Sequence, residues 1–151
     1  MKIIFLDVDG VLNHLETFRL NPHEVPIVLC KDCVARFKTL VHKAQAEVVL
    51  SSTWRLYQDT IEELISEGIL ALACDDWRTK DLYNEGEEAP LRGIEIAEWL
   101  SRHPEVDNYI ILDDESDMLP EQFSRFVQTS FENGGLTQEL ADKALALMTA
   151  C

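Results

Sequence analysis

The length, composition and charge of the chain limit the classes of protein to which it can belong. Its 151 residues suit one folded domain, and 46% hydrophobic with 27% charged residues is typical of a globular protein with a hydrophobic core. A formal net charge of −15 excludes a broad basic surface for nucleic acid, while leaving room for a local basic pocket. No apolar run reaches the roughly 18 residues of a membrane span, and the N-terminal run ends too soon for a signal peptide. We therefore expect a single cytoplasmic domain over residues 1–151, without a membrane partner.

Short apolar runs alternate along the chain with stretches of helical periodicity. The runs are rich in β-branched and aromatic residues and too short for helices, which is typical of buried strands. Capping residues and glycines indicate where the helices begin and end. In chain order, the predicted elements are a strand at 2–7, a helix at 31–46, a strand at 47–51, a helix from a capping-box-like start at Asp59 to a stop at Gly68, a weaker strand at 69–73, a helix at 92–102, a strand at 109–112, a short strand at 126–129 and a last helix capped by Thr137.

This alternation predicts an α/β fold. Strands that are apolar along their whole length are buried on both faces, which is typical of a parallel sheet covered by helices. We therefore expect a three-layer, Rossmann-like sheet of about five parallel strands with helices on both faces.

Acidic residues cluster where two of the predicted strands end. Asp7 and Asp9 lie at the end of the first strand, and Asp113 and Asp114 follow the strand at 109–112. In open α/β sheets, ligands bind in the crevice beyond the carboxyl ends of the strands. Several carboxylates at one edge repel each other unless a cation compensates them, and a purely oxygen ligand set suits Mg²⁺. The sequence therefore predicts a Mg²⁺ site at this edge.

The residue types at the same edge indicate phosphoryl chemistry. Mg²⁺ neutralises the charge of a phosphoryl group in its transition state, and an aspartate can attack that group to form an aspartyl phosphate. Ser51, at the end of the second strand, and Arg92, at the start of a helix, would hold the phosphoryl oxygens. A calcium-binding loop that starts at Asp7 is excluded, because its twelfth position is Phe18 where a bidentate glutamate belongs.

Four short motifs follow one another along the chain. They are Asp7-Val8-Asp9-Gly10, Ser51 after Val48-Val49-Leu50, Arg92, and Asp113-Asp114. In this order they resemble the signatures of the haloacid dehalogenase (HAD) superfamily of phosphatases, and the resemblance covers most of the chain.

The resemblance implies a role for each motif. Asp7 would be the nucleophile and Asp9 the general acid and base. Mg²⁺ would be bound by Asp7, the Asp9 carbonyl and Asp113, with Asp114 or Asp117 completing the metal shell. The implied activity is Mg²⁺-dependent hydrolysis of phosphomonoesters through an aspartyl phosphate.

Two further features refine the resemblance. Arg92 stands where lysine is commoner in the superfamily, and Ser52 competes with Ser51 for the phosphate, although Ser51 directly follows the apolar run and is preferred. The segments 51–55 and 92–96 look closest to the HAD domain of multi-domain RNA repair ("Swiss army knife") proteins.

The substrate class is predicted from what surrounds the site. HAD enzymes carry caps inserted after the first or third strand, but here 11–29 and 74–91 are too short to fold as caps with their own cores. An open site favours a nucleotide, an RNA or DNA end or a phosphoprotein over a small metabolite. A positive rim that could bind an additional phosphate is predicted from Arg55, Arg78, Lys80 and Arg92, unless these are scattered solubilising charges.

Other interpretations remain open from the sequence. One is a non-catalytic, Mg²⁺-binding domain that resembles a phospho-receiver, although no lysine follows the fifth strand as a receiver would require. A second concerns Cys30 and Cys33, which have the CxxC spacing of zinc ligands or a redox pair. No second CxxC or histidine pair follows at zinc-site spacing, so buried free cysteines are the simpler interpretation.

Overall fold

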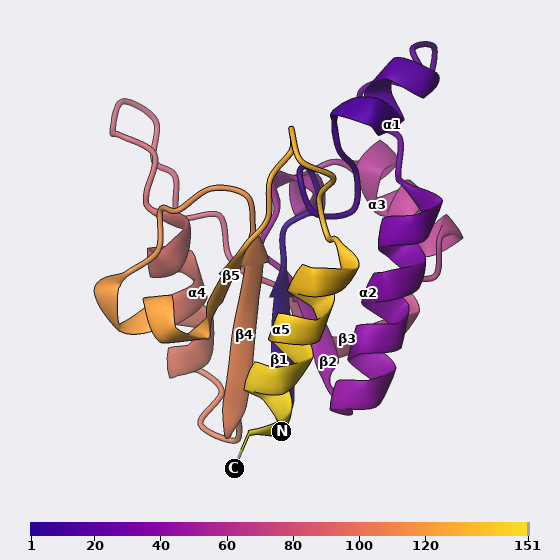
Figure 1. The fold of residues 1–151 in the computed structure, drawn as a ribbon. Coiled ribbons are helices and arrows are strands. Elements are labelled where there is room, and N and C mark those ends of the chain that lie inside the picture. Colours follow the sequence, from indigo (N-terminus) through magenta and orange to yellow (C-terminus); the bar gives the residue numbers. More distant parts are fainter. Residues whose placement is uncertain (151) are drawn as a thin grey trace.

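A five-stranded, all-parallel sheet forms the centre of the computed structural model, which describes residues 1–150 (Figure 1). Cys151, the last residue of the predicted domain, lies outside the described residues. The sheet order is β3-β2-β1-β4-β5. The strands are β1 (Lys2–Leu6), β2 (Glu47–Leu50), β3 (Ala73–Arg78), β4 (Asn108–Asp113) and β5 (Phe126–Gln128).

Helices cover both faces of this sheet. Helices α2 and α5 pack on one face and α4 packs on the other (Figure 1). The helices are α1 (Leu15–Leu20), α2 (Lys31–Ala44), α3 (Gln58–Ser66), α4 (Arg92–Ser101) and α5 (Gln138–Thr149). The predicted three-layer fold is therefore confirmed. The segment from β1 to α2 contains only the short α1, and the segment from β3 to α4 contains no described helix or strand, so neither carries a cap domain.

The alternation of side chains along the strands explains why the apolar runs are continuous. Ile4 and Leu6 of β1 point into the core under α2 and α5, whereas Ile3 and Phe5 pack with Trp99 of α4. Successive side chains of a strand point to opposite faces, so a strand between two helical layers must be apolar at every position. Within residues 1–150, no helix is long and apolar enough to cross a membrane.

The third strand is the main departure from the sequence prediction. The predicted strand at 69–73 is wrong, because Leu70–Leu72 forms a 3₁₀ turn and β3 begins at Ala73. Strand β3 lies at the edge of the sheet and pairs only with β2, so it tolerates polar residues such as Asp75 and Asp76. A polar edge strand has neither a continuous apolar run nor a clean alternation, and its pattern therefore resembles a loop.

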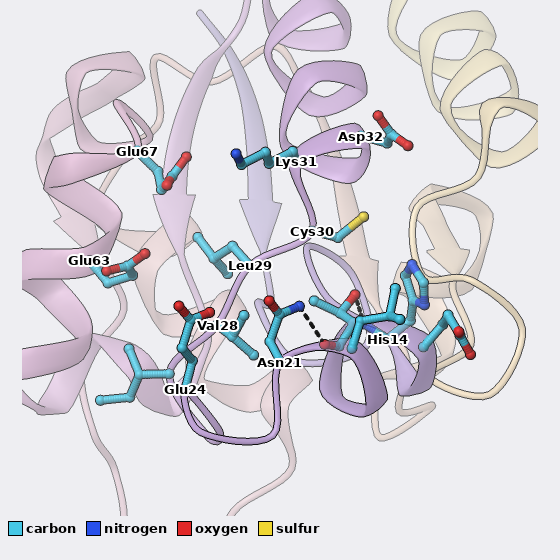
Figure 2. A pocket seen from close by; sticks show the side chains of 14 residues that line it. His14, Asn21, Glu24, Val28, Leu29, Cys30, Lys31, Asp32, Glu63 and Glu67 are labelled. Carbon is cyan, nitrogen blue, oxygen red and sulfur yellow. Dashed lines mark hydrogen bonds between the residues drawn. The ribbon is translucent and has the colours of Figure 1, made fainter.

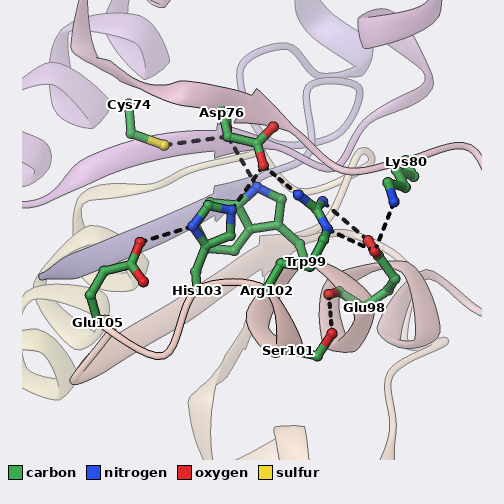
Figure 3. Close-up of polar contacts among 9 residues, drawn as sticks. All are labelled: Cys74, Asp76, Lys80, Glu98, Trp99, Ser101, Arg102, His103 and Glu105. Atoms are coloured by element: carbon green, nitrogen blue, oxygen red, sulfur yellow. Dashed lines mark hydrogen bonds and ion pairs between the residues drawn. The ribbon is translucent and has the colours of Figure 1, made fainter.

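A polar network joins this edge strand to the end of α4 (Figure 3). The Asp76 carboxylate accepts a hydrogen bond from Arg102 at 2.7 Å and pairs with a ring nitrogen of His103 at 2.8 Å. The Trp99 indole donates to the Asp76 carbonyl at 3.0 Å, and the His103 ring stacks on the Trp99 ring with centroids 3.8 Å apart. These contacts tie β3 to the helix that begins with Arg92.

The network should make stability depend on pH. Burial disfavours the charged ring of His103, but its hydrogen bonds to Glu105 and Asp76 outweigh burial and raise its pKa. A raised pKa contributes stability that is fully present below the unfolded value of about 6.5 and is lost as pH rises through the folded value. We expect His103→Gln to lower the Tm most near pH 6 and progressively less above neutral pH. The exposed His42, changed to Gln, is the matched control, and a Tm deficit that stays constant with pH would contradict the account.

Candidate active site at the carboxyl ends of the strands

Three polar residues stand side by side where β1, β2 and β4 end. Leu6 is paired with Leu50 of β2 and with Leu112 of β4, so the next residues, Asp7, Ser51 and Asp113, are neighbours across the sheet. The Asp7 N–H donates to the Leu112 carbonyl at 2.9 Å, and the Ser51 N–H donates to the Leu6 carbonyl at 3.1 Å. The strand order changes direction at β1, because β2 and β3 lie on one side of it and β4 and β5 on the other. In α/β sheets, ligands bind at such a switch point.

A carboxylate cluster lies at this point. Side-chain oxygens of Asp7, Asp113 and Asp114 all lie within 4.8 Å of one another, and Asp7 and Asp113 are buried. Burial, and then the neighbouring Asp113, raise the pKa of Asp7 well above its usual range. Burial also raises the pKa of Asp113 to about 7. Buried like charges need a compensating cation, so these residues fit the predicted Mg²⁺.

One oxygen of the cluster gives a second test of this fit. The Asp113 Oδ2 atom is buried and has no hydrogen-bond partner, whereas buried polar atoms are nearly always paired. A metal ligand is an ordinary explanation for such an atom. The Asp113 Oδ1 atom is already used, because it accepts a hydrogen bond from the Glu115 N–H at 2.9 Å.

Gly10 is required by the close approach of two loops at this cluster. Its φ is +81°, and a Cβ atom there would collide with the Asp114 carboxylate. The Thr129 hydroxyl donates to the Gly10 carbonyl at 2.6 Å and fixes the loop from the other side. The glycine of the first motif therefore lets Asp114 join the carboxylate cluster.

The Asp9 carboxylate is held by two residues that the sequence did not predict. Asn13 Nδ2 donates to it at 2.8 Å and Trp54 Nε1 donates at 3.1 Å. Asn13 is itself buried and accepts a hydrogen bond from the Gly10 N–H at 2.9 Å. An asparagine within the otherwise apolar run Val11-Leu12-Asn13 was the available signal. Trp54 gave no such signal, because a tryptophan there is equally typical of packing.

The predicted phosphate ligands lie beside Asp7. Arg92 Nη1 is 3.6 Å from Asp7 Oδ1, and neither this nitrogen nor the buried Ser51 hydroxyl has a hydrogen-bond partner. The Ser52 hydroxyl instead accepts the Trp54 N–H at 3.1 Å and caps the 3₁₀ turn Thr53–Leu56. The geometry therefore favours Ser51 over Ser52 as the phosphate ligand.

Asp117 has a different place from Asp114. Its carboxylate accepts the Arg92 N–H at 3.0 Å, and its carbonyl accepts the Gly93 N–H at 3.1 Å. Asp117 thus satisfies the first N–H groups of α4 and sets where Arg92 lies. Of the two alternatives for completing the metal shell, Asp114 is the one whose carboxylate joins Asp7 and Asp113.

The predicted position of Arg55, on an exposed rim of the site, is wrong. Its side chain is only 2% exposed and lies beneath the site rather than on a rim. A guanidinium has five N–H donors, and all five are used here. They donate to the carbonyls of Ser51, Ser52, Thr79 and Lys80 and to the carboxylate of Glu95.

The other predicted rim cations, Arg78 and Lys80, already have partners within the protein. The Arg78 guanidinium donates to the Arg55 carbonyl at 2.9 Å and lies over the Trp77 ring, and Lys80 pairs with Glu98 at 3.2 Å. Arg92 is the one member of the predicted rim that faces the carboxylate cluster.

A comparison with protein families agrees with this geometry. The family model described as "HAD domain in Swiss Army Knife RNA repair proteins" matches residues 3–141, from β1 into α5. Comparison with curated proteins and with solved structures gave no match. The matched range contains every motif residue of the site. The chain therefore belongs to the family of HAD domains found in Swiss Army Knife RNA repair proteins.

Proposed function

We propose that this chain is a Mg²⁺-dependent phosphomonoester hydrolase that acts through an aspartyl phosphate on Asp7. One observation carries the proposal. The buried side-chain atoms without a hydrogen-bond partner in residues 1–150 are Ser51 Oγ, Arg92 Nη1 and Asp113 Oδ2, and all three belong to the site around Asp7. Two of them suit phosphoryl oxygens and the third suits a cation, so one bound phosphate ester with its metal would satisfy all three.

The first step transfers the phosphoryl group to the protein. A carboxylate oxygen of Asp7 attacks phosphorus, and the bond from phosphorus to the leaving oxygen breaks. Asp9 donates a proton to the leaving oxygen. Ser51 and Arg92 hold the remaining phosphoryl oxygens, and bound Mg²⁺ would supply positive charge against the charge that these oxygens carry.

The second step returns Asp7 to its starting state. Asp9, now a carboxylate, accepts a proton from a water molecule that attacks phosphorus, and the bond from phosphorus to Asp7 breaks. The hydrogen bonds from Asn13 and Trp54 fix the Asp9 carboxylate in direction. Both donors leave lone pairs on the carboxylate free for the proton that it must carry.

A phospho-receiver-like signalling domain is the alternative from another class. Both readings include phosphorylation of an aspartate, but a receiver keeps its phosphoryl group whereas a phosphatase releases inorganic phosphate. The held carboxylate of Asp9, two residues after Asp7, favours turnover. The discriminating experiment is an assay of phosphate release with Mg²⁺, with and without a chelator. Stoichiometric labelling without multiple turnovers would support the receiver.

The substrate we propose is a nucleotide or the phosphorylated end of a nucleic acid. The family description names RNA repair, and a cavity of about 390 Å³ adjoins Arg92. Two tyrosines that line this cavity, Tyr57 and Tyr83, are 59% and 51% exposed. Exposed aromatic rings beside a phosphate site can stack on a base. Stacking supplies binding energy that an acidic protein does not obtain from electrostatic attraction, because its net charge repels the nucleic-acid backbone.

This substrate class makes a prediction for Tyr57. Stacking on one base is worth about 1–3 kcal/mol, so Tyr57→Ala should lower kcat/KM for a nucleotide or oligonucleotide end by roughly 5- to 150-fold. The rate with p-nitrophenyl phosphate should barely change, because this ester has no base. Tyr109 of β4 packs against Phe5 and is not a suitable control. Phe123→Ala, at an exposed aromatic residue outside the lining of the cavity, serves instead. Sugar phosphates hydrolysed as fast as nucleotides would contradict the substrate class.

A further inference from the structure

Three soft metal ligands come together outside the carboxylate cluster. His14, Cys30 and Cys33 each offer a ligand atom, and these atoms all lie within 4.8 Å of one another. The sequence shows the CxxC pair but no partner for it. The fold supplies one, because the loop after β1 brings His14 to the start of α2.

The start of α2 places the two sulfur atoms on the same side. Cys30 is the N-cap of this helix and Cys33 lies in its first turn, three residues further on, where side chains are neighbours. His14 precedes α1 and approaches from the other chain segment. Cys33 is fully buried, and its thiol donates a long hydrogen bond of 3.6 Å to the Gly134 carbonyl. Both cysteines are free thiols.

We propose that His14, Cys30 and Cys33 bind a soft divalent cation of the Zn²⁺ type. Two thiolates and one imidazole form three corners of the tetrahedral N/S set that Zn²⁺ prefers. On binding, each cysteine releases its proton to water, so two negative sulfurs balance the two charges of the cation. The site goes beyond the proposed phosphatase activity and does not depend on it.

A neighbouring pocket gives a cation access to two of the three ligand residues. His14 and Cys30 line a pocket of about 840 Å³, so two of the three ligand residues border open space (Figure 2). Cys33 is buried and is not part of this lining. The pocket carries five carboxylates against the single ammonium of Lys31, and this charge attracts a cation rather than an anion. The carboxylates belong to Glu16, Glu24, Asp32, Glu63 and Glu67.

A metal here would fasten the loop that orients Asp9. The Cys30 N–H donates to the Leu12 carbonyl at 2.7 Å, and Asn13 Nδ2 donates both to the Val28 carbonyl at 3.1 Å and to Asp9. These bonds already join the loop after β1 to the segment before α2. Coordination of one metal ion by His14 on one side and by the cysteines on the other would link the same two segments. The folded state would then gain stability that increases with metal affinity.

Metal uptake by the reduced protein tests the proposal. The protein is incubated with Co²⁺ in the presence of excess Mg²⁺, which saturates the carboxylate cluster, and the thiolate-to-cobalt charge-transfer band is recorded. We expect the band at about one Co²⁺ per chain and its displacement by Zn²⁺. It should be lost in Cys30→Ser and weakened in His14→Ala. Cys74→Ser, which removes a thiol on β3 outside the cluster, is the matched control and should keep the band.

Stability measurements keep the test independent of folding and of catalysis. Zn²⁺ should raise the Tm of the wild type and of Cys74→Ser but not of Cys30→Ser, whose half-buried position tolerates the change better than that of Cys33. A reduced wild-type chain that takes up neither cation would overturn the proposal. A Cys30–Cys33 disulfide that forms in air, combined with no cobalt band after reduction, would overturn it in favour of a redox pair. None of these readouts requires phosphatase activity.

Discussion

Replacing Asp7 by asparagine is expected to lower kcat for phosphomonoester hydrolysis by on the order of 10⁴-fold or more. The amide keeps the shape of the side chain but is not a nucleophile, so no aspartyl phosphate can form. The fold should survive, because burial and the nearby Asp113 already raise the pKa of Asp7 and make its charge costly. The measurement is the Mg²⁺-dependent release of phosphate from p-nitrophenyl phosphate and from a nucleotide.

Stability is the control for this variant. Asp7→Asn removes one of the two buried carboxylates of the cluster, so its Tm without added Mg²⁺ should equal or exceed that of the wild type. Asp142→Asn changes an exposed aspartate on α5 and should alter neither rate nor Tm. Turnover retained in a folded Asp7→Asn protein would remove Asp7 from the role of nucleophile.

The second large effect concerns stability rather than rate. Arg55→Ala should lower the free energy of unfolding by about 3–5 kcal/mol, because it leaves the buried Glu95 carboxylate without the partner that it has at 3.1 Å. Four backbone carbonyls would also lose a donor. Denaturant unfolding measures the change. Arg55→Lys should recover only part of it, because an ammonium has three donors in place of five.

An exposed arginine provides the comparison. Arg19 pairs weakly with Glu16 at 3.9 Å and is 68% exposed, so Arg19→Ala should change stability by no more than about 0.5 kcal/mol. A stable Arg55→Ala protein that loses only its nucleotide activity would contradict the buried role and restore Arg55 to the substrate.

Sequence pattern predicts the parts of this fold that depend on local periodicity. The strands β1, β2 and β4 contain the continuous apolar runs 3–6, 48–50 and 109–112, and the ends of these runs place Asp7, Ser51 and Asp113 at one edge by geometry alone. Strand β3 could not be predicted in this way, because an edge strand that is half exposed and polar lacks both signals.

Long-range contacts explain where the sequence prediction failed at the site. Arg55 looks like a surface cation, and only its approach to Glu95, forty residues away, shows that its charge is buried. His14 has no neighbour in the sequence at the spacing of a metal site. It comes close to Cys30 and Cys33 only in the folded chain, through the turn before α2. Asp114 and Asp117 are alternatives in the sequence, and the structure distinguishes them because Asp114 joins the carboxylate cluster whereas Asp117 binds the start of α4.

The most direct test of the account is to trap the phosphoryl group on Asp7. Asp9→Asn should slow hydrolysis of the aspartyl phosphate on the order of 10²–10⁴-fold. Formation of the aspartyl phosphate from p-nitrophenyl phosphate should be affected much less, because this good leaving group needs little help from an acid. Mixing this variant with the ester and Mg²⁺ should therefore give a phosphorylated chain, with the phosphoryl group mapped by mass spectrometry to the peptide that contains Asp7. Two results would contradict the account. One is a phosphoryl group on another residue, and the other is an Asp9→Asn variant that hydrolyses the ester at the wild-type rate without a phosphorylated chain.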